Sequence, residues 1–115
     1  MWPTLRSRRQ FDLVYTQGTK LASDSLVLFL LADAPGDPHV AYVASRKVGG
    51  AVERNRAKRL LRAAFRELAD GPHPPRGWLV LVARRAILDL KSQEVAIELR
   101  ALLEDSSRSR DEHTA

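Results

Sequence analysis

Residues 46–66 read RKVGGAVERNRAKRLLRAAFR, and this stretch does more than any other to decide the fold and the function of the chain. Eight basic residues against a single acid, Glu53, give it a net charge of +7. The whole chain carries only +5, so the remaining residues are together slightly negative. Because the positive charge is concentrated in one short segment, we expect the partner of the chain to be a polyanion.

The same stretch has the periodicity of an amphipathic helix, which we expect to open at Gly49-Gly50 and to run to about residue 69. At about 100° per residue, its apolar residues fall on one side, which predicts a stripe docked on a core. The members of this stripe are Ala57, Leu60, Leu61, Ala64, Phe65 and Leu68. The polar and basic residues on another side are Arg54, Asn55, Lys58, Arg59, Arg62 and Arg66.

The basic side of this helix differs from an ordinary solvated face. Solvated faces usually mix charges of both signs and gain ion pairs between residues four apart, whereas this side carries no carboxylate. Its cations also begin near the helix N-terminus, where the macrodipole disfavours positive charge. Local stability does not account for this placement, whereas binding of phosphate groups does.

Length and composition limit the remaining possibilities. A chain of 115 residues is expected to form one domain with a modest core. The absence of cysteine excludes disulfides, a thiolate nucleophile and thiolate metal sites. No apolar run approaches the roughly 20 residues that cross a bilayer, and the N-terminus lacks a signal-peptide pattern, so we expect a cytoplasmic protein. The sequence pI of about 10.2 favours nucleic acid as the partner over an anionic membrane surface.

Local patterns around the basic helix predict five further elements. Ser7 is expected to cap a helix over residues 8–17, which Gly18 ends. A final amphipathic helix is expected over residues 92–103. Apolar runs predict buried strands over residues 21–32, 39–45 and 78–83.

The order of these elements is helix, strand, strand, helix, strand, helix. It predicts an α+β fold, a two-layer α/β sandwich with helices on a small sheet. Residues 70–77 hold too many prolines for regular structure. We expect a single domain over residues 1–104 and a disordered polar tail over residues 105–115.

No catalytic residue and no metal ligand is predicted in this chain. His39, His73 and His113 lack the spacing of metal ligands. The sequence has neither a nucleophile elbow nor a P-loop. Its acidic residues are scattered, whereas a two-metal nuclease needs carboxylates clustered at strand ends.

Residues 54–62, RNRAKRLLR, resemble the RNR motif of the bacterial ribonuclease P protein subunit. The wider string VASRKVGGAVERNRAKRLLRAAFR resembles the most diagnostic region of that family. Upstream, RQFDLVYTQG at residues 9–18 resembles its first helix and terminal glycine, and the strand at residues 78–84 and the final helix follow in the expected order. The resemblance covers about residues 5–104, and the combination of motif, flanks and element order makes it specific.

The resemblance implies a fold like domain 2 of ribosomal protein S5, with a left-handed β-α-β crossover that the general rule of handedness would not predict. It also implies that the chain is an accessory subunit of an endoribonuclease. In that family a large RNA subunit cleaves precursor tRNA with the help of metal ions, and the protein helps to bind the 5′ leader. The expected partners are therefore ribonuclease P RNA and precursor tRNA, with magnesium held mainly by RNA and no obligate protein partner.

The resemblance also gives separate roles to two sets of residues. Those that match the RNR helix and are expected to bind the RNA subunit are Arg54, Asn55, Arg56, Lys58, Arg59, Arg62 and Arg66. Those expected to bind the leader are Phe11, Tyr15, Phe29, Arg46 and Lys47. Aromatic faces stack on unpaired bases at about 1–3 kcal/mol each with little sequence preference, which suits an enzyme that accepts many leaders. Taken without the family, the three aromatic residues fit a place in the core as well.

Two other functions stay open on the residues alone. A structural RNA-binding protein of the ribosomal type, with no role in tRNA processing, would also use a basic helix face. An autonomous metal-dependent nuclease is the weaker alternative, because no carboxylate cluster supports it.

Overall fold

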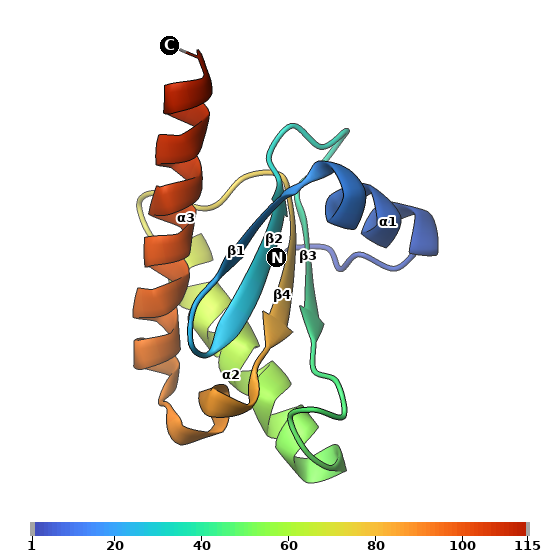
Figure 1. Cartoon of the computed structure of the whole chain (residues 1–115), viewed down its shortest axis with the longest axis vertical. Helices are drawn as coiled ribbons and strands as arrows, with labels where there is room; N and C mark the ends of the chain where they lie inside the picture. Colours follow the sequence, from blue (N-terminus) through green and yellow to red (C-terminus); the bar gives the residue numbers. More distant parts are fainter. Residues whose placement is uncertain (1, 115) are drawn as a thin grey trace.

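A four-stranded sheet in the order β1-β2-β4-β3 organises the computed structural model, which describes residues 2–114 and, for side chains, residues 2–107 (Figure 1). Strand β2 (Leu26–Leu31) pairs antiparallel with both β1 (Thr19–Ala22) and β4 (Trp78–Ala83). Strand β3 (His39–Val43) pairs parallel with β4. The α+β fold class predicted from the sequence is confirmed.

The strand count differs from the sequence prediction, because the single strand expected over residues 21–32 is two strands, β1 and β2. The element order is therefore α-β-β-β-α-β-α, with a 3₁₀ helix, Arg85–Asp89, between β4 and the last helix. The two strands are joined by a Ser-Asp-Ser turn, in which the Ser23 N–H donates to the Leu26 carbonyl at 2.9 Å. Serine and aspartate favour such turns, but β1 has only four residues and no buried face, so its sequence carries little strand signal.

Helix α1 (Arg8–Gln17) has the bounds that the sequence predicted, because both of its ends are encoded locally. Ser7 and Gln10 form a capping box, in which the Gln10 N–H donates to Ser7 Oγ and the Ser7 N–H donates to Gln10 Oε1, both at 3.1 Å. At the other end, Gly18 passes very close to the backbone of β2. A Cβ on this residue would lie 2.8 Å from the Leu30 carbonyl oxygen, so only glycine fits there without a shift.

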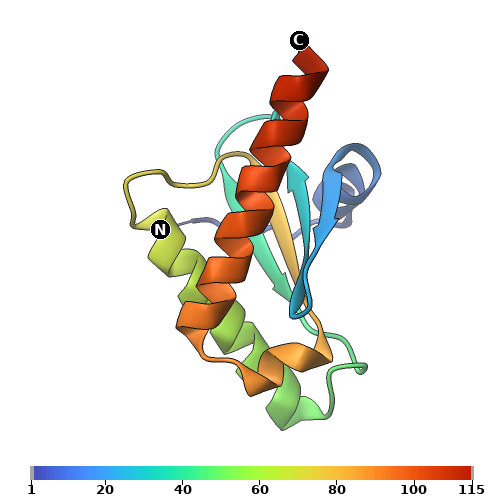
Figure 2. The same cartoon turned by 60° about the vertical axis from the view of Figure 1, so that its left-hand side comes forward.

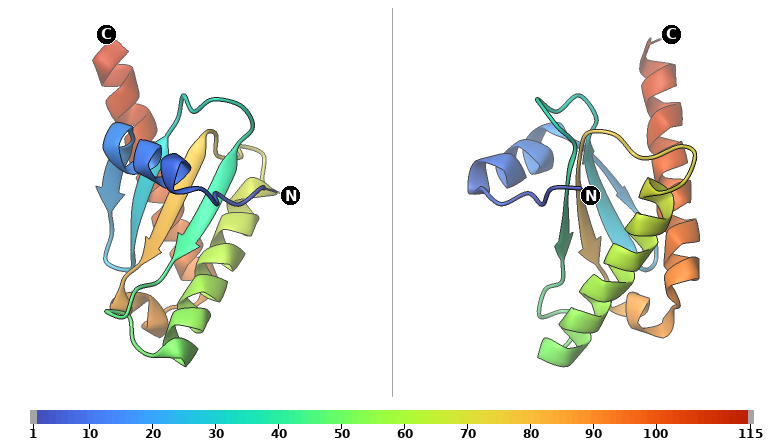
Figure 3. Two further views of the ribbon diagram at one scale, coloured as in Figure 1. Left: turned by 90° about the vertical axis from the view of Figure 1, so that its right-hand side faces the viewer. Right: turned by 180° about the vertical axis from the view of Figure 1, so that it is seen from behind.

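Alternating side chains divide the core between the two faces of the sheet. On β2, the buried residues Leu26, Leu28 and Leu30 pack against α2 (Ala51–Ala69) and α3 (Ser92–Thr114). Residues Val27, Phe29 and Leu31 point to the opposite face, where α1 crosses one end of the sheet (Figure 3). The two-layer sandwich is thus made by the sheet with α2 and α3, as Figure 2 shows, and α1 adds a partial third layer.

The connection from β3 through α2 to β4 joins two adjacent parallel strands, and its handedness is left-handed (Figure 3). This crossover is rare, since nearly all such connections are right-handed. The edge of β3 is partly covered by the N-terminal segment. Val40 accepts a hydrogen bond from the Leu5 N–H at 3.1 Å and donates one to the Pro3 carbonyl at 3.0 Å.

Helix α3 is longer than the sequence predicted. It runs over Ser92–Thr114, whereas the pattern of apolar residues ends at Leu103 and a disordered tail was expected from residue 105. Ser106 is almost fully buried, so the helix still packs against the protein at this position. The expectation of a tail failed because a polar sequence carries no apolar period beyond Leu103. Within residues 2–114, no helix is both long enough and apolar enough to cross a membrane.

Candidate nucleic-acid interface

Helix α2 begins where two glycines allow the chain to turn sharply into it. Gly50 is the N-cap residue, and the Arg54 N–H donates to its carbonyl at 2.9 Å. Gly49 has φ +149°, and a Cβ there would lie 2.9 Å from Cβ of Glu53. This backbone conformation favours glycine, so the double glycine sets the direction in which α2 leaves the sheet edge.

The buried side of α2 matches the predicted apolar stripe. Its buried members are Ala57, Leu61, Ala64, Phe65 and Leu68, and Leu60 is half-buried at the margin of the same core. Because this side is fixed against the sheet and α3, the opposite side is held in a defined orientation toward solvent. The helix therefore presents its polar residues as a rigid array.

The predicted RNR residues all lie on the free side of α2. Arg54 and Lys58 are half-buried, and the exposed members are Asn55, Arg56, Arg59, Arg62 and Arg66. Within residues 2–107, none of these cations is paired with a carboxylate. Their few recorded contacts are weak, such as Arg54 Nε to the Gly50 carbonyl at 3.4 Å. Six positive side chains on one helix thus remain available to an anionic partner.

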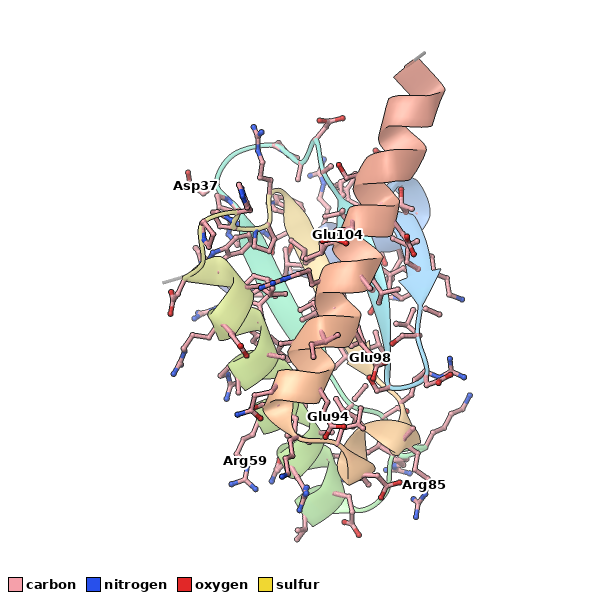
Figure 4. All side chains as sticks on the ribbon, turned by 90° about the vertical axis from the view of Figure 1, so that its left-hand side faces the viewer. Asp37, Arg59, Arg85, Glu94, Glu98 and Glu104 are labelled. Carbon is pink, nitrogen blue, oxygen red and sulfur yellow. The ribbon has the colours of Figure 1, made fainter. Side chains whose placement is uncertain are left out.

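These cations point in two directions. Lys58, Arg62 and Arg66 recur every four residues and line the side of α2 that faces β3. Arg59 points away from the body of the protein, as Figure 4 shows. The Arg62 guanidinium lies 5.3 Å from the centre of the Tyr42 ring, within the range of a cation–π contact. Burial raises the pKa of the Tyr42 hydroxyl, and the positive charges of Arg62 and Arg66 partly oppose that shift.

Arg46 and Lys47 lie in the loop between β3 and α2, and both are exposed. The loop is anchored, because Val48 is buried and its N–H donates to the Ser45 carbonyl at 3.0 Å. The two cations are therefore held at the end of β3, beside the start of α2. This position agrees with the prediction that they lie between the two expected RNA surfaces.

Two further arginines, Arg84 and Arg85, belong to the same end of the molecule but were not predicted as site residues. Both are exposed and follow β4 directly. Arg85 donates from Nη1 to the Val48 carbonyl at 3.0 Å and so ties the 3₁₀ helix to the loop that holds Lys47 (Figure 4 labels Arg85). The signal was an Arg-Arg pair after a buried strand, but only the parallel pairing of β3 and β4 brings the two strand ends together.

The three predicted aromatic residues meet on the α1 face of the sheet. The ring of Tyr15 lies 6.1 Å from that of Phe11 and 4.8 Å, edge to face, from that of Phe29. Tyr15 is 41% exposed, whereas Phe11 and Phe29 are half-buried and contribute to the core under α1. Lys20 Nζ lies 5.8 Å from the centre of the Phe29 ring. The rings therefore serve the core and still border on solvent, and their role toward RNA stays a prediction.

A metal-binding role finds no support in the described part of the chain. No group of three or more histidine or acidic residues there is placed to hold a metal ion. The chemistry that these surfaces offer is contact with phosphates through α2 and the neighbouring loop, and stacking through the aromatic residues of α1 and β2.

Comparison with known proteins agrees with this geometry. The family model for ribonuclease P matches residues 3–107. The chain belongs to the ribonuclease P protein family. A ribonuclease P protein component from a Nitratiruptor species is 40% identical over 105 residues, covering 91% of this chain and 93% of that relative.

Solved structures of the ribonuclease P protein share the fold. The protein from Thermotoga maritima superposes with a TM-score of 0.72 at 27% identity, over 89% of this chain and 96% of that one. The protein from Staphylococcus aureus gives a TM-score of 0.76 at 21% identity, over 92% and 96% of the two chains. This chain is therefore the protein subunit of an endoribonuclease that processes tRNA, which implies association with ribonuclease P RNA.

Proposed function

We propose that this subunit holds ribonuclease P RNA on the basic side of α2 and guides the 5′ leader of precursor tRNA across the α1 face of the sheet. The observation that carries the proposal is the array of unpaired cations on α2, which is rigid because the other side of the helix is buried. The RNA subunit then performs the cleavage that releases the leader and leaves the mature 5′ end.

The α2 array suits a folded RNA with closely spaced phosphates. Arginine predominates over lysine on this helix, and guanidinium groups make two parallel hydrogen bonds to a phosphate. No internal ion pair must be broken before RNA binds, so the attraction is not offset by a competing carboxylate. Asn55, which is exposed among the cations, adds a neutral donor and acceptor to the same surface.

The α1 face suits a single strand. Tyr15 with Phe29 offers aromatic surface to unpaired bases, and Lys20 stands over the Phe29 ring where a backbone phosphate would need a cation. Farther along the same face, Val27, Val43 and Val82 are half-buried, and the sheet there has no helix over it (Figure 3). This path leads from the aromatic residues toward Arg46 and Lys47 at the end of β3.

Catalysis is assigned to the RNA and its magnesium ions, with no residue of this chain touching the reacting atoms. The protein contributes by lowering the electrostatic repulsion between the RNA subunit and its substrate. Such a contribution is largest when magnesium is scarce, because divalent ions otherwise neutralise the same phosphates.

The decisive experiment is cleavage of a 5′-extended precursor tRNA by bacterial ribonuclease P RNA at low magnesium, with and without this protein. We expect cleavage at the mature 5′ end only when the protein is present, and none from the protein alone. Tight RNA binding without any stimulation would contradict the proposal and favour a structural, ribosomal-type RNA-binding protein. Cleavage by RNA-free protein would indicate an active site in the chain itself.

A further inference from the structure

A hollow of about 660 Å³ lies between the N-terminal segment, β3 and α2, on the opposite side of β3 from the α1 face. Three aromatic residues line it: Trp2, Tyr42 and Phe65. None of them belongs to the predicted leader surface. The hollow exists because the N-terminal segment pairs with the edge of β3 and so brings Trp2 against α2.

The aromatic residues form a connected group. Phe65 is buried, with its ring centre 4.8 Å from that of Trp2 and 6.2 Å from that of Tyr42, both in edge-to-face arrangements. Trp2 and Tyr42 are only half-buried, so both rings border on solvent. A flat apolar group can therefore contact aromatic surface that the protein already holds in place.

The same hollow is lined by three cations, Lys58, Arg62 and Arg66, which follow one another along one side of α2. The guanidinium of Arg62 already stacks near the Tyr42 ring at 5.3 Å. Asp70 is the one acid among the described residues that line the hollow, and it lies at the far end of the helix. The hollow thus combines aromatic surface with a net positive charge.

We propose that this hollow binds one unpaired nucleotide of ribonuclease P RNA, with the base against Trp2 and Tyr42 and its phosphate on Arg62 and its neighbours. A nucleotide joins a flat ring to a negative charge, which is the combination that the lining residues complement. The nucleotide is unpaired, because a base inside a helix has both faces stacked. This inference rests on the proposed function, and it adds a base-stacking anchor to an α2 surface otherwise suited to phosphates.

The test is equilibrium binding of ribonuclease P RNA to the full chain at fixed salt, with leucine and phenylalanine variants compared at the same two positions. Trp2→Leu and Tyr42→Leu each remove a ring and keep an apolar side chain, and we expect each to weaken binding by about tenfold. Trp2→Phe and Tyr42→Phe keep a ring, and we expect binding within about threefold of the wild type. Acylation of RNA 2′-hydroxyls should identify an unpaired nucleotide that becomes protected only with the ring-bearing proteins.

Each outcome decides the matter. Leucine variants that bind the RNA as tightly as the wild type overturn the inference. A loss of affinity only for precursor tRNA with its leader, measured on the assembled holoenzyme, also overturns it, since the occupant would then be the leader. Failure of the wild-type protein to bind ribonuclease P RNA would instead refute the proposed function. If Tyr42→Leu lowers the melting temperature strongly, the Trp2 pair of variants decides alone, because Trp2 lies outside every helix and strand.

Discussion

Helices α2 and α3 pack against each other and against the same face of the sheet, yet they use their charges in opposite ways. Helix α2 carries six basic residues against two acidic ones. The described part of α3, residues 92–107, carries four acidic residues against one basic residue, with Glu94, Glu98 and Glu104 labelled in Figure 4. The two helices therefore share a core and differ almost entirely in what they show to solvent.

The difference lies in whether a charge has a partner within the protein. On α3, Glu94 accepts a hydrogen bond from the Lys91 N–H at 3.0 Å, and Glu98 accepts from the Ser25 N–H and hydroxyl at 3.2 and 2.7 Å. The cations of α2 have no such partners among residues 2–107. Charges that hold the fold together thus lie on α3, and charges left for another molecule lie on α2.

The strongest way to break this comparison is to remove the α2 charges. The triple variant Arg54→Ala, Arg56→Ala, Arg59→Ala should lose at least about 100-fold in affinity for ribonuclease P RNA, because each charged contact is worth roughly 1.5–3 kcal/mol. Its melting temperature should stay close to that of the wild type, since no internal partner is lost. The binding and melting curves check both statements.

A charge-matched control removes three cations elsewhere, with Arg76→Ala, Lys91→Ala and Arg100→Ala. These residues are exposed and lie off the α2 surface, so affinity should fall far less than in the α2 triple variant. An equal loss in both variants would mean that net charge, and not the α2 array, governs binding.

The comparison is sharpened by a surface that works with little charge. Tyr15→Ala should weaken binding of leader-bearing precursor tRNA to the holoenzyme by about tenfold, through loss of base stacking. It should leave the slope of log affinity against log salt unchanged, whereas the α2 triple variant should reduce the slope for the RNA subunit by about 2–3. Tyr15→Phe is the matched control and should behave as the wild type. A changed salt slope in Tyr15→Ala would show that the two surfaces are not separate.

On α3, removing a charge should affect stability and not RNA. Glu98→Gln weakens the contact that fastens the β1–β2 turn to α3, and it should cost about 1–2 kcal/mol of unfolding free energy with RNA affinity unchanged. Glu104→Gln is the control on the same helix, because Glu104 is exposed and has no recorded hydrogen bond. A drop in RNA affinity for Glu98→Gln would contradict the division of roles.

The effect of Glu98 should also depend on pH. Burial opposes its ionisation, but hydrogen bonds from Ser23 and Ser25 outweigh burial and hold the pKa of Glu98 below its usual value. A carboxyl whose pKa is lowered on folding stabilises the protein above its unfolded pKa of about 4.3, and this contribution is lost as the pH falls through the folded pKa. The stability difference between wild type and Glu98→Gln should therefore be full at pH 6 and shrink below about pH 4. Chemical denaturation across this range measures it.

The smallest expected effect concerns the cap of α1. Ser7→Ala removes the hydroxyl that accepts the Gln10 N–H and should cost about 1 kcal/mol. Ser7→Asp restores an acceptor and should recover most of that loss. Because Ser7 touches neither RNA surface, affinity for ribonuclease P RNA should not change. An effect on that affinity would place α1 in the RNA-subunit interface.

The sequence by itself determined the parts of this protein that local chemistry encodes. The bounds of α1 follow from Ser7, Gln10 and Gly18, and the two sides of α2 follow from a 3.6-residue period of apolar side chains. The RNR string within α2 pointed to the family that the comparisons then showed. These features need no knowledge of distant residues, so one sequence was enough to find them.

Only the tertiary structure decided what depends on residues far apart in the chain. Strand β1 exists because β2 pairs with it, and four half-polar residues give no signal of that pairing. The ends of β3 and β4 meet through parallel pairing, which places Arg84 and Arg85 beside the loop of Arg46 and Lys47. Trp2 reaches Phe65 only because the N-terminal segment follows the edge of β3. Side-chain periodicity reports which face an element buries, but it carries no information about which element lies next to it.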